Sequence, residues 1–130
     1  MTLLQTRDLK AFYGDFQALF GIDLALAAGE TVAIIGANGA GKTTLLRSVS
    51  GIIANAPEAV TLEGRPIGAL AAPEVVALGI AMVPEGRKLF ASLSVEENLL
   101  IGRYGRDVAG PWTLDSVYGL FPVLKERRNV

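Results

Sequence analysis

The glycine-rich segment Gly36–Thr43 constrains the fold of this chain more than any other part of it. Its residues, GANGAGKT, fit the pattern of a glycine, four variable residues and Gly-Lys followed by Ser or Thr. The apolar run Thr31–Ile35 comes directly before it, and apolar residues at helical spacing follow it. We therefore predict a strand over 31–35 buried on both faces of a parallel sheet, then a turn, then a helix over Thr43–Ser50 that stops at Gly51.

This strand, loop and helix arrangement predicts phosphate binding. Glycines let the backbone turn so that successive N–H groups point at phosphate oxygens, and the helix adds the positive end of its dipole. Lys42 then reaches the outer phosphates, and the Thr43 hydroxyl occupies one position on a magnesium ion. The alternative is a glycine-rich turn with a merely solvated Lys42, which the flanking strand and helix disfavour.

The predicted ligand is a nucleoside triphosphate, ATP with Mg²⁺. GTP is disfavoured because the chain has no Asn-Lys-x-Asp motif of the kind that reads guanine. The nucleotide-binding candidates in and next to the loop are Gly36, Asn38, Gly39, Ala40, Gly41, Lys42, Thr43 and Thr44.

Strand and helix signals continue on both sides of the loop. Leu3–Phe12 and Ala18–Leu26 are expected to be neighbouring strands joined by a turn at Gly14-Asp15. Beyond the loop, we expect a weak strand at Val60–Gly64 and a buried strand over Ile80–Val83. We also expect three helices: one over Pro73–Leu78, one from a Ser94–Glu97 capping box to about Gly102, and one from Thr113 that breaks at Pro122. This order of elements predicts an α/β fold.

Charge and residue content exclude several functions. The 12 basic and 13 acidic residues give a net charge of −1, which argues against a nucleic-acid partner. The chain has no Cys and no His, which excludes disulfides, Cys or His zinc sites and His acid–base catalysis within it. No run approaches the roughly 18 apolar residues of a membrane span. We expect a soluble, cytoplasmic chain.

Several motifs, in this order, resemble the ATP-binding subunits of ABC transporters: Tyr13-Gly14, Gly29-Glu30, Gly36–Leu46 and Val83–Arg87. The Val-Pro-Glu-Gly-Arg form of the last motif, with Leu89-Phe90 and Ser94–Leu99 after it, resembles the class that serves branched-chain amino-acid uptake. The resemblance runs from about Leu3 to Arg128.

The resemblance implies an incomplete P-loop NTPase core with an antiparallel β layer over residues 1–84. Residues 85–130 are then a Q-loop-like segment and the start of a helical subdomain that meets the permease. The complete protein would be an ATPase at the cytoplasmic side of the cell membrane. It would pair with a second ATP-binding subunit and with transmembrane permease subunits, and ATP hydrolysis would drive amino-acid import.

Two residues outside the loop gain roles only through this resemblance. Tyr13 matches the aromatic residue that stacks on adenine, although a half-buried strand residue is the alternative. Glu85 falls where most of the family has Gln, in a loop that touches magnesium, the attacking water and the permease. A carboxylate can ligate magnesium but donates no hydrogen bond when ionised. Glu85 is therefore a candidate magnesium ligand and catalytic residue, and a surface Glu in a turn fits equally well.

Turnover needs an Asp at the end of an apolar strand and an adjacent Glu, and the chain has neither after the loop. In the resembled family these residues, the signature sequence and a switch His lie further on. We therefore expect the first half of an ATP-binding domain, without a confident catalytic residue and without turnover of its own. An ABC-class ATPase outside transport, or a nucleotide-binding module without turnover, remain alternatives.

Overall fold

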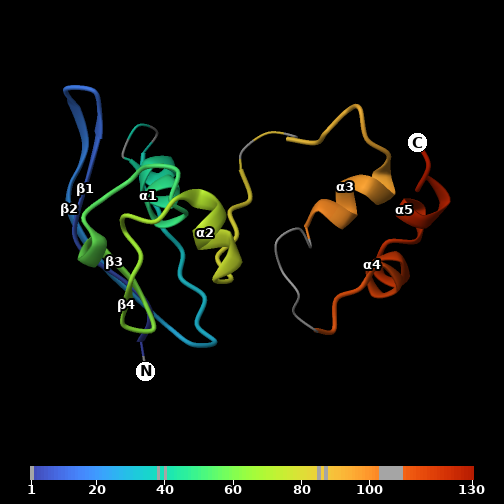
Figure 1. The fold of residues 1–130 in the computed structure, drawn as a ribbon, viewed down its shortest axis with the longest axis horizontal. Helices are drawn as coiled ribbons and strands as arrows, with labels where there is room; N and C mark the ends of the chain where they lie inside the picture. The colour runs from blue at the N-terminus through green and yellow to red at the C-terminus, as the bar shows by residue number, and fades with distance from the viewer. Residues whose placement is uncertain (1, 38, 40, 85, 87, 103–109) are drawn as a thin grey trace. The chain divides into compact units, whose positions relative to one another are not determined.

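The computed structural model describes residues 2–37, 39, 41–84, 86, 88–102 and 110–130 (Figure 1). The chain divides into two compact units, Met1–Met82 and Val83–Val130. The assignment of residues 1–84 and 85–130 to a nucleotide-binding core and a helical subdomain stays a prediction.

A long antiparallel hairpin organises the first unit. Strands β1 (Thr2–Tyr13) and β2 (Phe16–Ala27) are joined by the turn Gly14-Asp15, so the predicted hairpin is confirmed. Gly14 has a φ of 62°, the left-handed conformation that such short hairpin turns require. The short strands β3 (Val60–Leu62) and β4 (Arg65–Pro66) extend the sheet, whose order is β2-β1-β3-β4.

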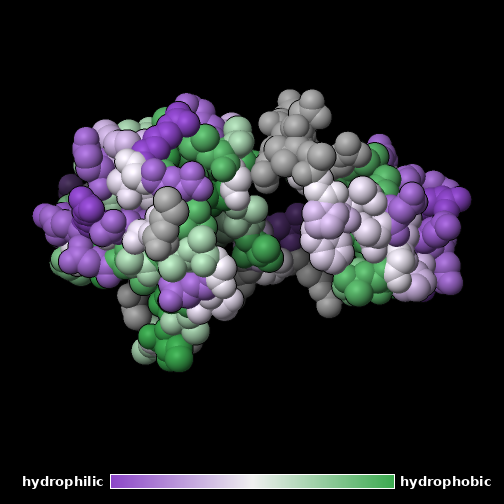
Figure 2. Space-filling model, turned by 90° about the horizontal axis from the view of Figure 1, so that it is seen from below, coloured by the Kyte–Doolittle hydropathy of each residue, from purple (hydrophilic) through white to green (hydrophobic). Residues whose placement is uncertain are grey.

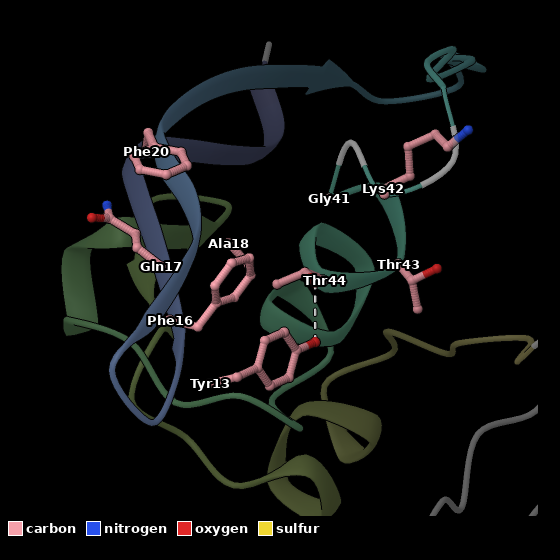
Figure 3. Close-up of a pocket in the computed structure, with 10 residues that line it drawn as sticks. Tyr13, Phe16, Gln17, Ala18, Phe20, Gly41, Lys42, Thr43 and Thr44 are labelled. Atoms are coloured by element: carbon pink, nitrogen blue, oxygen red, sulfur yellow. Dashed lines mark hydrogen bonds between the residues drawn. The ribbon is translucent and has the colours of Figure 1, made fainter.

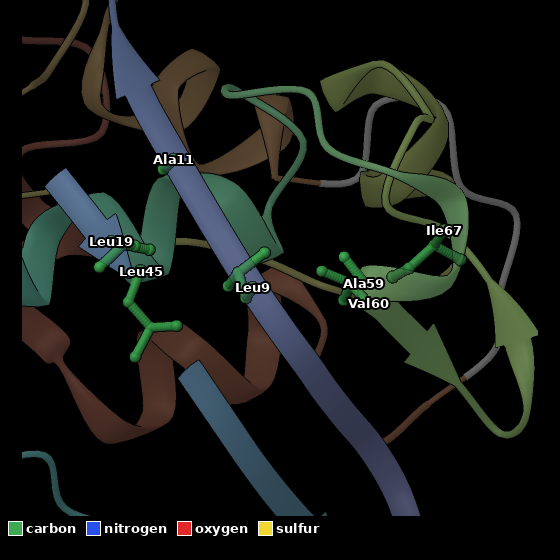
Figure 4. Packing of buried hydrophobic residues seen from close by; sticks show 7 residues of the cluster. All are labelled: Leu9, Ala11, Leu19, Leu45, Ala59, Val60 and Ile67. Atoms are coloured by element: carbon green, nitrogen blue, oxygen red, sulfur yellow. The ribbon is translucent and has the colours of Figure 1, made fainter. Parts of the chain in front are cut away.

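Two helices and one 3₁₀ turn complete the first unit: α1 (Lys42–Val49), η1 (Pro57–Ala59) and α2 (Ala72–Ala77). Helix α1 is followed by Gly51, whose φ of 84° ends it as predicted. Figure 4 shows the core, in which Leu45 of α1 and Leu19 of β2 belong to one buried cluster. Its members are Leu9, Ala11, Leu19, Leu45, Ala59, Val60 and Ile67. The helix that follows the glycine-rich loop is thus anchored on the hairpin.

The two buried strands predicted from the sequence are not formed, and these predictions were wrong. Neither Thr31–Ile35 nor Ile80–Val83 is a strand, and Ile35 and Val83 are 94% and 92% exposed. A strand exists only beside a hydrogen-bonding neighbour, and the sheet formed by the described residues includes neither segment. Hydrophobic residues reach the surface of both units on the face drawn in Figure 2.

Three short helices build the second unit: α3 (Val95–Ile101), α4 (Leu114–Leu120) and α5 (Pro122–Glu126). The predicted capping box is confirmed, since Ser94 Oγ accepts from Glu97 N at 3.2 Å and Ser94 N donates to Glu97 Oε1 at 2.9 Å. Thr113 caps α4 and Pro122 breaks the chain into α5, as predicted. Across the described ranges, no helix is long and apolar enough to cross a membrane.

Candidate nucleotide-binding site

A cavity of about 530 Å³ lies where the tip of the β1–β2 hairpin meets the start of α1 (Figure 3). One wall comes from the hairpin and the other from the glycine-rich loop and the first turn of the helix. The lining residues are Tyr13, Phe16, Gln17, Ala18, Phe20, Gly39, Gly41, Lys42, Thr43 and Thr44. The fold therefore brings Tyr13 and the predicted phosphate loop to one place.

Glycine is required in the loop for two separate reasons. Gly39 and Gly41 have φ values of 84° and 94°, in the left-handed region that favours glycine. A Cβ atom on Gly41 would also lie 2.8 Å from Leu19 Cδ2 and 3.3 Å from the Ala18 carbonyl oxygen. Gly41 occupies the N-cap position of α1 and has no side chain to cap the first N–H groups. Those donors and the positive end of the helix dipole therefore remain for an anion.

Lys42, Thr43 and Thr44 form the first turn of α1, and all three residues line the cavity. The ammonium group of Lys42 donates a hydrogen bond to the Gly36 carbonyl oxygen, so the side chain folds back over the loop. Thr43 is exposed, whereas Thr44 is buried. The turn thus presents a cation and a hydroxyl to solvent and keeps a second hydroxyl inside.

Tyr13 ends β1 with 44% of its surface exposed. Its phenol oxygen lies 3.0 Å from Thr44 Oγ1 and accepts a 3.5 Å hydrogen bond from Arg47 Nη1. The hydrogen bond with Thr44 is the main reason that the pKa of Tyr13 lies below its ordinary value. Partial burial opposes this shift, and the nearby Arg47 guanidinium adds to it.

Six of the predicted site residues line the cavity: Tyr13, Gly39, Gly41, Lys42, Thr43 and Thr44. Gly36 does not line it but accepts the hydrogen bond from Lys42. Asn38, Ala40 and Glu85 lie outside the described residues.

The residues present fit a magnesium–nucleotide complex better than a bare metal ion. No group of three or more His, Cys, Asp or Glu side chains that could hold a metal occurs in the part of the chain that the structure describes. Magnesium commonly takes few protein ligands and completes its shell with phosphate oxygens and water. Thr43 can offer one such ligand, next to the loop and helix turn that suit the phosphates.

Five residues at this site were not predicted from the sequence. Phe16, Gln17, Ala18 and Phe20 line the cavity, and Arg47 contacts Tyr13. The sequence could have indicated that Phe16, Ala18 and Phe20 lie together, because alternate residues of a strand share a face. Arg47 follows Thr44 at a spacing of three, which places both on one helix face. The contact with Tyr13 had no sequence signal.

Comparison with known proteins agrees with this geometry. The family model described as ABC transporter matches residues 19–129. A high-affinity branched-chain amino acid transport ATP-binding protein of Pseudomonas aeruginosa is 40% identical over 126 residues, which are 96% of this chain and 54% of that protein. A ribose import ATP-binding protein of Yersinia pestis is 35% identical over 100 residues, which are 77% of this chain and 20% of that protein.

A solved structure of an ATP-binding subunit of an ABC transporter also matches, with a TM-score of 0.76 and 26% identity, over 98% of this chain and 53% of that one. The chain thus spans about half the length of the branched-chain relative and of this structure. The predicted α/β fold class and the family resemblance are confirmed. This chain belongs to the ABC transporter family, whose members bind and hydrolyse ATP.

Proposed function

We propose that this chain is the phosphate- and base-binding part of the ATP-binding subunit of an ABC importer. The observation that carries the proposal is the cavity that is lined both by the glycine turn with Lys42–Thr44 and by Tyr13. A cavity with an anion-binding end and an aromatic end suits a nucleotide, because a nucleotide has a charged end and a planar end.

The phosphate end works through the loop and α1. The N–H groups at the start of α1 and the left-handed turns at Gly39 and Gly41 bind phosphate oxygens without a side chain in between. Lys42 exchanges the Gly36 carbonyl for phosphate oxygens, since a charge-assisted hydrogen bond is stronger than a bond to a neutral carbonyl. Magnesium, when bound, neutralises part of the phosphate charge, and the Thr43 hydroxyl holds it.

The base end works through the hairpin tip. Tyr13 presents a half-exposed ring, and the strongly exposed Phe16 and Phe20 extend the apolar wall beside it. Aromatic faces bind a planar base by stacking and by excluding water. Stacking of this kind accepts different bases. We therefore propose ATP, among the nucleotides, mainly because of the family relationship.

In the complete protein, we propose that ATP hydrolysis drives uptake of amino acids, with branched-chain amino acids as the solute class. The name of the Pseudomonas aeruginosa relative supports this, and the ribose import relative makes a sugar the second candidate. The partners are transmembrane permease subunits and a second ATP-binding subunit at the cytoplasmic side of the membrane. The balanced charge supports no nucleic-acid partner.

A binding module without turnover is the second candidate function for the chain by itself. The sequence has no Asp-Glu pair after an apolar run that could complete magnesium ligation and orient water. We therefore expect the chain to bind magnesium–ATP without releasing phosphate. Magnesium-dependent phosphate release that disappears in Lys42→Ala would contradict this expectation.

Calorimetric titration of the full chain with magnesium–ATP tests the proposal. Lys42→Ala should weaken binding at least about tenfold, because it removes a charge-assisted hydrogen bond to phosphate. Lys125→Ala is the matched control, because it removes a lysine from α5 of the other unit and should leave affinity unchanged. Equal affinity of the wild type and Lys42→Ala would overturn the proposal.

A further inference from the structure

The ring of Tyr13 is held by two side chains of α1 that come from a distant part of the sequence. Its phenol oxygen lies 3.0 Å from Thr44 Oγ1 and 3.5 Å from Arg47 Nη1 (Figure 3 shows the bond to Thr44). Thr44 is only 7% exposed, and its carbonyl oxygen accepts a 2.9 Å hydrogen bond from Ser48 Oγ within the same helix. The hydroxyl that meets Tyr13 therefore belongs to a buried, well-anchored helix position.

Arg47 lies at the surface, and its observed polar contact is the phenol of Tyr13 rather than a carboxylate. Among the residues that the structure describes, the ion pair found is Lys10–Asp8, so Arg47 has no acidic partner there. Helical spacing places Arg47 one turn beyond Thr44, on the side of α1 that the hairpin tip approaches. The hydrogen bond that the structure gives the Arg47 guanidinium is the one to the phenol of Tyr13.

These contacts bear on how a base would bind. An aromatic side chain at a strand end, with 44% of its surface exposed, can adopt several orientations unless its far end is fixed. A ring fixed before the ligand arrives loses less conformational freedom on binding. The two groups that fix this ring sit on the helix whose first turn lines the phosphate end of the same cavity.

We propose that Arg47 and Thr44 are positioning residues for Tyr13, which hold its ring as a preformed platform for the nucleobase. The proposal deepens the nucleotide-binding function above and rests on it. It also makes base binding depend on α1, because the ring moves with the helix that binds the phosphates. Arg47 contacts neither base nor phosphate in this role and acts through the phenol alone.

The test compares two ligands of the full chain, magnesium–ATP and magnesium–tripolyphosphate, which lacks base and ribose. Tyr13→Phe keeps the ring but removes the phenol oxygen, and Arg47→Met keeps the stem but removes the donors. Arg47→Met should weaken ATP binding roughly threefold to tenfold, the range expected for losing one hydrogen bond. Tyr13→Phe loses both contacts of the phenol and should weaken binding at least as much. Each should leave tripolyphosphate affinity within about twofold, since neither changes a side chain of the loop or of the first turn of α1.

The double variant should bind ATP no more weakly than Tyr13→Phe alone, because both changes remove the same contact. Arg7→Met is the matched control, since it removes an exposed guanidinium from β1 away from the cavity. If Arg47→Met lost a similar amount of affinity for ATP and for tripolyphosphate, the proposal would be overturned. Arg47 would then act through general attraction of its charge to the phosphates. Unchanged ATP affinity in both single variants would overturn it too.

The two proposals can fail separately. A wild-type chain that binds neither ligand would overturn the nucleotide-binding function, and the positioning role would fall with it. A wild-type chain that binds ATP while Tyr13→Phe and Arg47→Met bind it equally well would overturn the positioning role alone. Thermal unfolding of each variant checks that a loss of affinity does not come from a loss of fold.

Discussion

The two sides of the glycine-rich loop differ sharply in how they are held. On the C-terminal side, α1 packs through Leu45 into the cluster that also includes Leu9 and Leu19 of the hairpin. On the N-terminal side, Thr31–Ile35 is as apolar as the strands but lies outside the sheet, and Ile35 is 94% exposed. Apolar side chains alone therefore do not bury a segment. A neighbouring backbone that accepts its hydrogen bonds is needed as well.

Truncating one side chain of the buried cluster and one of the exposed segment Thr31–Ile35 should give the largest contrast. Leu9→Ala should lower the free energy of unfolding by about 2–5 kcal/mol, because it removes a fully buried side chain and leaves a cavity. Ile35→Ala should change it by less than about 0.5 kcal/mol, because that side chain faces solvent. Urea denaturation of the two variants measures both. An equal loss at Ile35 would show that this segment is covered in solution, and the contrast would fail.

Alanine variants of two glycines with left-handed backbones distinguish the cost of backbone strain from the cost of a packing clash. Gly29 and Gly41 have φ values of 75° and 94°, but only Gly41 lies against Leu19 and Ala18. Both alanine variants should lose about 1–2 kcal/mol from the left-handed conformation. Gly41→Ala should lose about 1–3 kcal/mol more through the clash, and it should also weaken magnesium–ATP binding.

Equal stabilities of Gly29→Ala and Gly41→Ala in the same urea experiment would contradict this packing. The result would mean that the loop does not rest on β2, and α1 would then be anchored through Leu45 and Val49. A larger loss in Gly41→Ala without any loss of affinity would separate the packing from the phosphate site.

Replacing single tyrosines should have the smallest effect on stability. Tyr13 of the first unit and Tyr118 of the second have pKa values shifted in opposite directions. The hydrogen bond with Thr44 holds the pKa of Tyr13 below its ordinary value of about 10. Burial, and secondarily the nearby Glu96, raises the pKa of Tyr118, whose hydroxyl has no hydrogen-bond partner among the described residues. In an absorbance titration of phenol ionisation, Tyr13→Phe should remove a component that titrates early, and Tyr118→Phe one that titrates late.

The two shifts act on stability in opposite directions. The lowered pKa of Tyr13 adds stability that appears as pH rises through that pKa and is complete above about 10. The raised pKa of Tyr118 adds stability that is present below about 10 and is lost as pH rises through the raised value. Tyr118→Phe should therefore reduce the sensitivity of folding to alkali. An unchanged alkaline transition would contradict the burial of this phenol.

Features with local causes were predicted well from the sequence. The turn at Gly14-Asp15, the Ser94 capping box and the break at Pro122 each depend on residues a few positions apart. The left-handed turns at Gly39 and Gly41 belong to the same group, because glycine allows this conformation. Local chemistry is therefore sufficient for these elements, whatever the rest of the chain does.

Features that depend on distant partners were predicted poorly. The Thr31–Ile35 strand failed because its pattern says nothing about which backbone would pair with it. The contact between Tyr13 and Thr44 joins residues 31 positions apart, so no spacing rule could reveal it. Arg47 escaped notice for the same reason. Its position on α1 was predictable, but the approach of the hairpin tip to that helix was not.

The length of the β1–β2 hairpin has a consequence for the size of ligand that the cavity admits. Tyr13 and Phe16 are paired directly across the Gly14-Asp15 turn, so both rings mark the far end of the two strands. A strand advances about 3.3 Å per residue. Deleting two residues from each strand would keep every side chain on its face but withdraw both rings by about 7 Å. Deleting one from each would turn the rings to the opposite face. Hairpins that differ in length by two residues per strand would therefore place these rings on the same face but at different distances along the cavity.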